Sequence, residues 1–322
     1  MSTPVDIVRE HVTAGRLPSA VFGVADASGV RELVAFGAHP SDRYPLFSIT
    51  KPIVALAAAR HIEAGRLSVR TPLQAVLPDF ADAQTALDHL ASHTSGLDEP
   101  ALDTAVPLRH ELLTRGRVFA AGSAVQYSTL AYSGIAALIE HAGGRSWEAE
   151  VDDLFASLGA PHSISTDLTD ARSVPDAADA GHDMGAFAAQ RNPGAGLGGR
   201  AEDLLRLGAA LLRIAAGEDG EFLAPAMLDA MRVPRTTGLP RFDPNSPTAD
   251  RNWGLGWHVS PTGFGDPAVF GHGGWAGTEF WVHPTEGLAW VLLTNRALRN
   301  GVDAAALARL IARTRSAWIT PR

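Results

Sequence analysis

Segments with the pattern of β-strands lie near both ends of the chain, and a mainly helical stretch separates them. Two apolar runs at 19–26 and 30–37 flank Ala27-Ser28-Gly29, which predicts a hairpin. Further strands are expected at 253–260, 268–272, 278–283 and 288–294. The chain has no internal repeats and no low-complexity linker, so we expect one enzyme-sized unit with a helical lobe inserted between its sheet-forming ends.

Apolar residues at helical spacing predict the remaining elements. Helices are expected at 4–14, 48–65, 85–92, 108–115, 130–141, 146–158, 201–216 and 302–316. The polar stretch near 160–182 is expected to form irregular surface. A cleft is expected at the seam between the lobes, where ligand sites are common.

Composition excludes several functional classes. The 322 residues are 46% hydrophobic, which allows a sizeable core. A net charge of −8 without a basic cluster argues against binding to nucleic acid or to an anionic membrane. The chain has no cysteine, so disulfides, thiol catalysis and Cys-ligated metals are excluded. Because the first residues form a polar, amphipathic start and no apolar run approaches a membrane span, we expect a cytoplasmic protein.

Lys51 is the only lysine among 27 Lys and Arg residues. An amine can lose its proton near neutral pH when its surroundings lower its pKa, whereas a guanidinium cannot. Ser48 precedes Lys51 by three residues, and the residues after Lys51 have the pattern of a buried helix. Because positions i and i+3 share a helix face, the hydroxyl and the amine are expected to touch. This arrangement predicts a serine nucleophile activated by a lysine base.

Two further motifs carry candidate site residues. Tyr127-Ser128-Thr129 stands just before an apolar helix, where the phenol could move protons within a cleft. A buried tyrosine with a single hydrogen bond is the structural alternative. His272-Gly273-Gly274-Trp275 ends a predicted strand, and its glycines would let a substrate carbonyl approach backbone N–H groups. A simple tight turn is the alternative there.

The order and spacing of these three motifs resemble the serine β-lactamase and penicillin-binding protein superfamily. Within it, the chain is most similar to the branch of class C β-lactamases, D,D-peptidases and family VIII esterases. Supporting stretches are similar over nearly the whole chain, at 47–52, 63–68, 89–97, 196–204 and 253–257. The resemblance implies an α/β (α+β) fold with an antiparallel sheet flanked by helices. The α/β lobe would comprise 1–70 and 190–322, and the mainly helical lobe would comprise 71–189, with the active site at the seam.

The resemblance also implies roles for matching residues. Ser48 would be the acylated nucleophile, Lys51 its general base and Tyr127 a proton relay. The backbone N–H groups of Ser48 and Trp275 would form the oxyanion hole. Substrate-binding residues would be Thr129, His272, Gly273, Gly274 and Trp275. No metal and no organic cofactor are implied.

Two positions depart from the pattern of many relatives. Thr129 stands where an Asn is common, and its hydroxyl is shorter than an amide, which weakens the expectation of amide-substrate recognition. His272 stands where β-lactamases commonly have Lys, and a largely neutral imidazole captures a substrate carboxylate less well. Arg296 and Arg299, after the last predicted strand, are candidates for a replacement cation.

Other kinds of site have weaker support. The chain contains no Gly-x-Ser-x-Gly, the usual nucleophile motif of α/β-hydrolases. His89 and His93 have the spacing of a zinc pair but lack the Glu of His-Glu-x-x-His. The glycine-rich run at 194–199 is not followed by the Lys of a phosphate loop, so we expect it to pack beside the cleft.

We therefore interpret the sequence as that of a serine hydrolase that acts on small esters through an acyl-enzyme. The ester preference follows from Thr129 and His272 and from the absence of an export signal, because cell-wall substrates lie outside the cytoplasm. The alternatives are a β-lactamase or D-aminoacyl or D,D-peptidase, which would take a small amide, and a catalytically silent ligand-binding homologue. Tryptophans 253, 257 and 275 could line an apolar acyl pocket or pack in the core.

Overall fold

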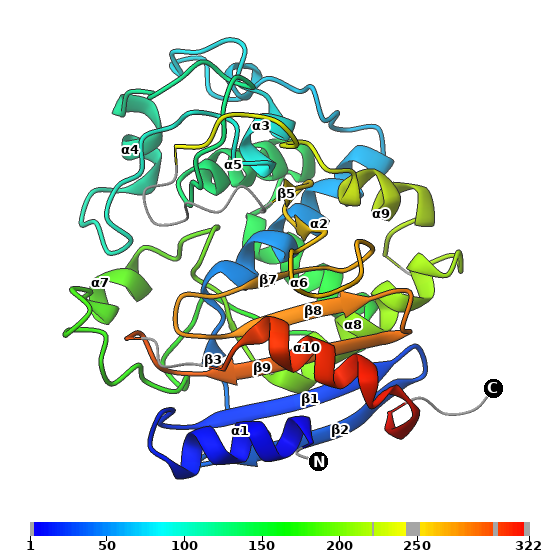
Figure 1. Ribbon diagram of the computed structural model, residues 1–322. Coiled ribbons are helices and arrows are strands. Elements are labelled where there is room, and N and C mark those ends of the chain that lie inside the picture. Colours follow the sequence, from blue (N-terminus) through cyan, green and yellow to red (C-terminus); the bar gives the residue numbers. More distant parts are fainter. Residues whose placement is uncertain (1–2, 221, 243–251, 299–301, 319–322) are drawn as a thin grey trace.

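The computed structural model describes residues 3–220, 222–242, 252–298 and 302–318 of the chain. An antiparallel seven-stranded sheet runs from β1 (Ala20–Asp26) and β2 (Gly29–Phe36) at the bottom of the molecule in Figure 1 up to β5 (Asn252–Trp253) in its upper half, and helices from the middle of the chain lie at the top. None of the helices in the described ranges has the length and apolar character needed to cross a membrane.

The sheet is built from both ends of the chain, as the sequence predicts. Its strand order is β2-β1-β9-β8-β7-β6-β5. The strands are β1 (Ala20–Asp26), β2 (Gly29–Phe36), β5 (Asn252–Trp253), β6 (His258–Val259), β7 (Phe270–Gly273), β8 (Glu279–His283) and β9 (Leu288–Thr294). The predicted hairpin is β1–β2, and β9 pairs with the other edge of β1. Every residue of β1 is buried, because the strand lies inside the sheet with helices on both of its faces.

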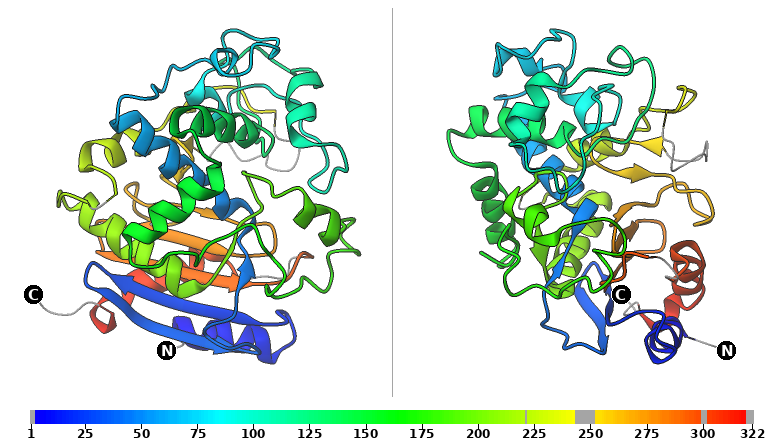
Figure 2. Two further views of the ribbon diagram at one scale, coloured as in Figure 1. Left: turned by 180° about the vertical axis from the view of Figure 1, so that it is seen from behind. Right: turned by 90° about the vertical axis from the view of Figure 1, so that its left-hand side faces the viewer.

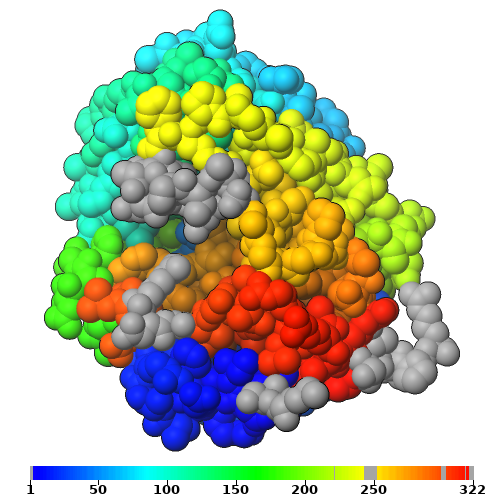
Figure 3. Space-filling view, viewed as in Figure 1, coloured from blue at the N-terminus to red at the C-terminus, as the bar shows by residue number. Residues whose placement is uncertain are grey.

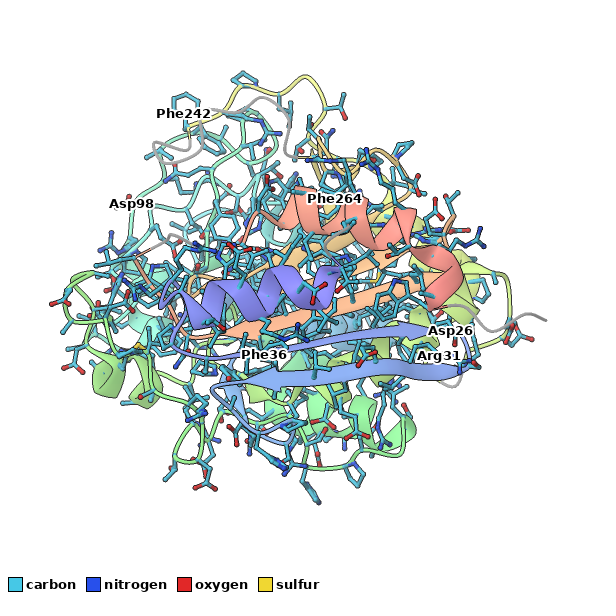
Figure 4. All side chains as sticks on the ribbon, turned by 60° about the horizontal axis from the view of Figure 1, so that its bottom comes forward. Asp26, Arg31, Phe36, Asp98, Phe242 and Phe264 are labelled. Atoms are coloured by element: carbon cyan, nitrogen blue, oxygen red, sulfur yellow. The ribbon has the colours of Figure 1, made fainter. Side chains whose placement is uncertain are left out.

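Helices cover both faces of this sheet. Helix α8 (Ala201–Ala215) packs on one face, whereas α1 (Pro4–Thr13) and α10 (Ala304–Arg313) lie side by side on the other (Figures 2 and 4). The period-2 alternation of a strand explains the division. Val21 belongs to the apolar cluster on the α8 side, and Phe22 belongs to the cluster beneath α1 and α10. These two layers hold the sheet in place between them.

The middle of the chain is largely helical. Its helices are α2 (Thr50–Glu63), α3 (Leu87–Ala91), α4 (Leu108–Thr114), α5 (Ala131–Gly143), α6 (Trp147–Ser157) and the short α7 (Met184–Ala189). Helix α2 is buried on nearly all sides and packs against α5 and α6. One cluster of buried apolar side chains runs from these helices to the α8 face of the sheet. The start of α2 is therefore fixed between the helices and the sheet. The lobe boundaries proposed from the sequence stay a prediction.

The structure corrects several predicted elements. The strand expected at 253–260 is two short strands, β5 and β6, separated by a turn. Gly254 and Gly256 cause the break, since Gly256 has a φ of +81° and a Cβ at Gly254 would lie 2.1 Å from the carbonyl oxygen of Met231. Helices α7 and α9 (Pro225–Arg232) were not predicted. Short strands β3 (Tyr44–Pro45) and β4 (Gly198–Gly199) pair separately, beside the start of α2.

Candidate active site

Ser48 lies in a tight turn that leads into α2. The turn is a single 3-10 turn over Phe47–Ile49, and the α-helix begins at Thr50, two residues later than predicted. Phe47 has a φ of +48°, a left-handed conformation that is strained for a bulky side chain. Packing of the Phe47 ring keeps this conformation in place. The ring stacks on that of Phe187 and meets that of Trp275 edge to face, with 5.3 Å between the ring centroids in each pair. Ser48 itself is half-buried.

Lys51 reaches Ser48, as their spacing predicts. Its Nζ donates to the Ser48 Oγ at 3.2 Å, to the Thr129 Oγ1 at 3.2 Å and to the backbone carbonyl oxygen of Gly194 at 2.9 Å. These three acceptors match the three protons of an ammonium group. The rings of Tyr127 and Tyr132 lie 4.6 and 5.5 Å from Nζ. The Lys51 amine is thus enclosed by these three acceptors and two rings, and the Ser48 hydroxyl is one of the groups that it contacts.

Burial lowers the pKa of Lys51 from 10.5 to about 7, although the nearby Glu99 carboxylate acts in the opposite direction. The cause is desolvation, because a fully buried ammonium loses the hydration that favours its charged form. Near neutral pH a substantial fraction of Lys51 is therefore a free amine. A free amine at this distance can accept the proton of the Ser48 hydroxyl.

Glu99 is a site residue that the sequence analysis did not identify. Its carboxylate accepts the backbone N–H of Thr129 at 2.9 Å and that of Leu130 at 3.2 Å. It also accepts the Ser128 hydroxyl at 2.8 Å. The carboxylate thus binds at the N-terminus of α5, where the helix dipole favours a negative charge. Burial nevertheless raises the pKa of Glu99 above its ordinary value.

Glu99 therefore holds the segment that carries Thr129 against Lys51. Its partners follow it by about 30 positions in the chain, which no local pattern reveals. The sequence signal that could have identified Glu99 is its position, two residues after the stretch 89–97 that resembles the family.

Tyr127 packs in an aromatic group beside Lys51. Its ring lies 4.4 Å from that of His93 and 5.5 Å from that of Trp253. His93 is fully buried and has a φ of +60°, and its Nδ1 accepts the backbone N–H of Ser128 at 3.1 Å. Burial, and secondarily the charge of Lys51, hold the pKa of His93 well below its ordinary value, so its imidazole is neutral. The packing against His93 and Trp253 thus fixes the position of the Tyr127 ring within the cleft.

The third motif forms the end of β7 and a tight turn next to Ser48. Gly274 donates its N–H to the Thr278 carbonyl oxygen at 2.6 Å, and the Thr278 hydroxyl donates to the Leu46 carbonyl oxygen at 3.2 Å. A Cβ at Gly274 would lie 2.0 Å from Thr278 Oγ1 and 2.7 Å from the Leu46 oxygen. Only glycine fits there. The turn and the Ser48 segment are thus locked together, with Trp275 packed on Phe47.

The three motifs line one cleft of about 730 Å³. It is the hollow seen between the gold segments and the red helix α10 in Figure 3. The residues of the three motifs that line it are Ser48, Tyr127 and 272–275. Aromatic side chains extend it toward α10, and Phe264 lies close to the start of that helix (Figure 4). The described lining residues are Ser48, Tyr127, Trp253, His258, Pro261, Thr262, Phe264, His272, Gly273, Gly274, Trp275, Glu279, Trp281, Val302, Asp303, Ala304 and Ala305.

Not every predicted site residue lies in this cleft lining. Thr129 is behind it, buried against Lys51. Trp257 is fully buried in the core rather than in an acyl pocket, whereas Trp253 and Trp275 line the cleft. Arg296 forms an ion pair with Asp176, with 3.2 Å between Nε and Oδ2. Arg299 lies outside the described residues.

The glycine-rich run and the possible zinc pair, which the sequence also suggested, lie outside the cleft lining. The run at 194–199 packs beside the cleft as expected, since Gly194 accepts from Lys51 and 198–199 form β4. His89 accepts the backbone N–H of Ala86 through Nδ1, at the start of α3. Within the ranges that the structure describes, no three His, Cys, Asp or Glu side chains are grouped so that they could hold a metal ion.

Two sequence comparisons relate the chain to known proteins. The sequence profile of the family described as Beta-lactamase matches residues 5–314. The chain is 30% identical over 315 residues to esterase EstB of Burkholderia gladioli, covering 79% of this chain and 77% of EstB.

Solved structures show the same fold. A penicillin-binding protein homologue from Caulobacter crescentus superposes with a TM-score of 0.77 at 22% identity, covering 97% of this chain and 96% of the homologue. EstCE1, described as a hydrolase with promiscuous acyltransferase activity, superposes with a TM-score of 0.74 at 22% identity, covering 96% and 97% of the two chains. The predicted arrangement of an antiparallel sheet flanked by helices is therefore confirmed.

Proposed function

Because the chain belongs to the β-lactamase family and is a serine hydrolase, we propose that it cleaves small esters through an acyl-enzyme on Ser48. The contact between Lys51 Nζ and Ser48 Oγ carries the proposal, since it joins a hydroxyl to a buried amine with a pKa of about 7. A serine needs such a base to become a nucleophile at neutral pH.

The proposed reaction has two halves. Lys51 removes the Ser48 proton while Oγ attacks the ester carbonyl carbon, and the carbonyl oxygen takes the negative charge. When the tetrahedral intermediate collapses, the bond to the alcohol oxygen breaks. That oxygen receives the proton from Lys51, with the Tyr127 phenol as relay. A water molecule, deprotonated by the same groups, then attacks the acyl-enzyme and releases the acid together with the free Ser48 hydroxyl.

The oxyanion would be stabilised by the backbone N–H groups of Ser48 and Trp275. The structure supports this assignment by holding the two segments together through the bond from Thr278 to Leu46 and the packing of Trp275 on Phe47. Oxyanion donors must be fixed before the reaction, because a donor that has to reorganise gives less stabilisation.

Two observations support esters over β-lactams as substrates. The relative with 30% identity is named an esterase. The cleft has aromatic walls, and none of its described lining residues is Lys or Arg, so a substrate carboxylate would find no fixed cation among them. Lys51 lies beyond this lining, and its charge is shared among three acceptors.

The test compares 4-nitrophenyl butyrate with a penicillin and a chromogenic cephalosporin. We expect the ester to have the highest kcat/KM and Ser48→Ala to remove its hydrolysis. A fluorophosphonate probe should label Ser48, and mass spectrometry should find no label on the buried Ser95 or Ser128. A kcat/KM for penicillin ten times that for the butyrate would show that the enzyme is a β-lactamase. Label on another serine would overturn the assignment of the nucleophile.

A further inference from the structure

The cleft that holds Ser48 continues well beyond the three motifs. Its volume of about 730 Å³ lies within the range of about 300 to 1,000 Å³ that is typical of pockets for drug-sized ligands. An ester of two short alkyl groups would occupy only the part next to Ser48. The part beyond the motifs, here called the aromatic arm, extends to the first turn of α10. Its aromatic and aliphatic lining residues within the described ranges are Trp253, His258, Pro261, Phe264, Trp281, Val302, Ala304 and Ala305.

A line of ring contacts leads from the proposed relay, Tyr127, into the aromatic arm. The Trp253 ring lies 5.5 Å from that of Tyr127 and 5.3 Å from that of His258. The Trp281 ring lies 5.5 Å from that of His258 and 4.6 Å from that of Phe264. Aromatic rings at these separations attract one another, and they offer the same attraction to a ring of a ligand. The arm is thus a continuous aromatic wall that starts beside the reacting groups.

The wall of the aromatic arm is formed before a substrate binds. Phe264 and Trp281 are only 8% and 4% exposed, so the core fixes their rings and each ring presents one part to the cleft. The Arg309 guanidinium of α10 donates to the carbonyl oxygen of Gly263, which joins the segment that carries Phe264 to the helix at the end of the arm. A ligand that binds to such a preformed surface loses little affinity to the ordering of side chains.

The carboxylates that line this region already accept hydrogen bonds from the protein. Glu279 accepts from Trp281 Nε1 at 2.8 Å, and Asp303 accepts the backbone N–H groups of Ala305 and Ala306 at 2.9 and 3.1 Å. A substrate group in the arm therefore does not have to supply a hydrogen-bond donor to them. The surface of the arm itself consists of rings and short aliphatic side chains, which favour a flat apolar group.

The position of Tyr127 indicates which part of an ester would enter the aromatic arm. Tyr127 is the proposed relay to the leaving alcohol, and the line of rings starts at its own ring. The alcohol oxygen must lie within reach of the relay for the proton to be transferred. A group attached to that oxygen through a short spacer would therefore lie against Trp253 and the rings beyond it.

We infer that the aromatic arm is the alcohol site of the enzyme, and that it selects esters whose alcohol carries a flat, uncharged aromatic group on a short alkyl spacer. This inference rests on the proposed esterase function and names a substrate class for it. Phe264, the last ring of the wall, is a specificity-determining residue in this arrangement.

Two pairs of neutral esters test the inference. Phenylpropyl acetate, with its phenyl group on carbon 3 of the alcohol, is compared with propyl acetate, and ethyl 3-phenylpropanoate, with its phenyl group on the acyl chain, is compared with ethyl propanoate. The two phenyl esters are isomers, and so are the two ring-free esters. We expect the phenyl group to raise wild-type kcat/KM, measured by proton release, at least about tenfold on the alcohol and by less on the acyl chain.

Phe264→Leu removes the last ring of the wall and keeps an apolar side chain. We expect it to lower the ratio of kcat/KM for phenylpropyl acetate to that for propyl acetate at least about threefold. Most of this loss should appear as a higher KM, because the Phe264 ring would bind a part of the substrate that does not react. Phe36→Leu is the matched control, since Phe36 packs against the same apolar cluster as Phe264 but lies on β2, outside the cleft (Figure 4). It should leave that ratio unchanged.

The outcomes separate the two proposals. If none of the four esters is hydrolysed, the esterase function itself fails. If propyl acetate is hydrolysed but the phenyl group on the alcohol gives no gain, or gives less than the phenyl group on the acyl chain, the arm is not the alcohol site. A Phe264→Leu enzyme that keeps the wild-type ratio would show that Phe264 does not determine specificity. If Phe264→Leu does not fold, the two phenyl effects on the wild-type enzyme decide whether the arm is the alcohol site.

Discussion

The Thr129 hydroxyl lies 3.2 Å from the Lys51 amine, and the backbone N–H of the same threonine is bound by Glu99 at 2.9 Å. The proposed base is therefore supported from behind by a segment that a buried carboxylate holds at the start of α5. Ser48 and Gly194 complete its surroundings. This arrangement makes the protonation of Lys51 depend on Glu99, which is not among the described residues that line the cleft.

Lys51→Arg should lose at least about a hundredfold in kcat. A guanidinium keeps its proton at neutral pH and so cannot accept the Ser48 proton, and the loss of a general base typically costs about 10² to 10⁴ in rate. Ester hydrolysis and circular dichroism of the purified variant check this. A folded Lys51→Arg enzyme with a third of the wild-type activity would rule out Lys51 as the base.

The pH dependence should follow Lys51. Its pKa is lowered by burial to about 7, and only the free amine accepts a proton, so kcat/KM should rise with pH through about 7 and level off above it. The measurement is a pH profile of kcat/KM with a neutral ester, whose own charge does not change. A profile that is flat between pH 5 and 9 would contradict this mechanism.

Glu99→Gln should shift the rising limb of that profile to lower pH. The negative charge of Glu99 favours the ammonium form of Lys51, and its removal makes the ammonium less stable. The groups that face Lys51 from other segments, His93, Tyr127 and Tyr132, remain in place.

We also expect kcat of Glu99→Gln to fall, because one amide cannot accept all the hydrogen bonds that the Glu99 carboxylate accepts. Asp98→Asn is the control, since Asp98 is half-exposed and pairs with Arg115 instead. Its profile should match that of the wild type. If the rising limb of the kcat/KM profile of Glu99→Gln stays in place or moves to higher pH, Glu99 has only a structural role.

Gly274→Ala should reduce kcat at least about tenfold and lower Tm. The added Cβ would meet Thr278 and the Leu46 carbonyl, so the turn must move away from Ser48, and with it the proposed oxyanion donor. Gly116→Ala is the control, because a Cβ there meets nothing within 4 Å and its φ is not positive. If Gly274→Ala is as active as Gly116→Ala, the position of this turn does not matter for catalysis.

Sequence reasoning was most successful where the determining contacts are local. The hairpin of β1 and β2, the amphipathic pattern of α8 and the contact of Ser48 with Lys51 all depend on neighbours within a few positions. The sheet-forming ends and the family were also predicted and are confirmed. The roles of Tyr127 and Trp275 stay predictions.

The errors arise from contacts between distant segments. The break between β5 and β6 is required by the approach of Gly254 to Met231 and of Gly256 to α2, and neither neighbour is close in the sequence. The approach of Glu279 to Gly273 was not predicted, because it depends on the register that the pairing of β7 with β8 defines. A strand pattern identifies the faces of a strand but not its partner.

The pairing of β1 with β9 also affects how the protein is made. Ala20 pairs with Thr294, so β1 leaves the ribosome long before β9, which follows it in the chain by about 270 residues. Sheets with such distant partners fold slowly, and the unpaired edge is open to aggregation in the meantime. Ser48 leaves the ribosome early, but Thr278, which holds its turn, follows much later. The nascent chain therefore carries the proposed nucleophile long before the turn that positions it can form.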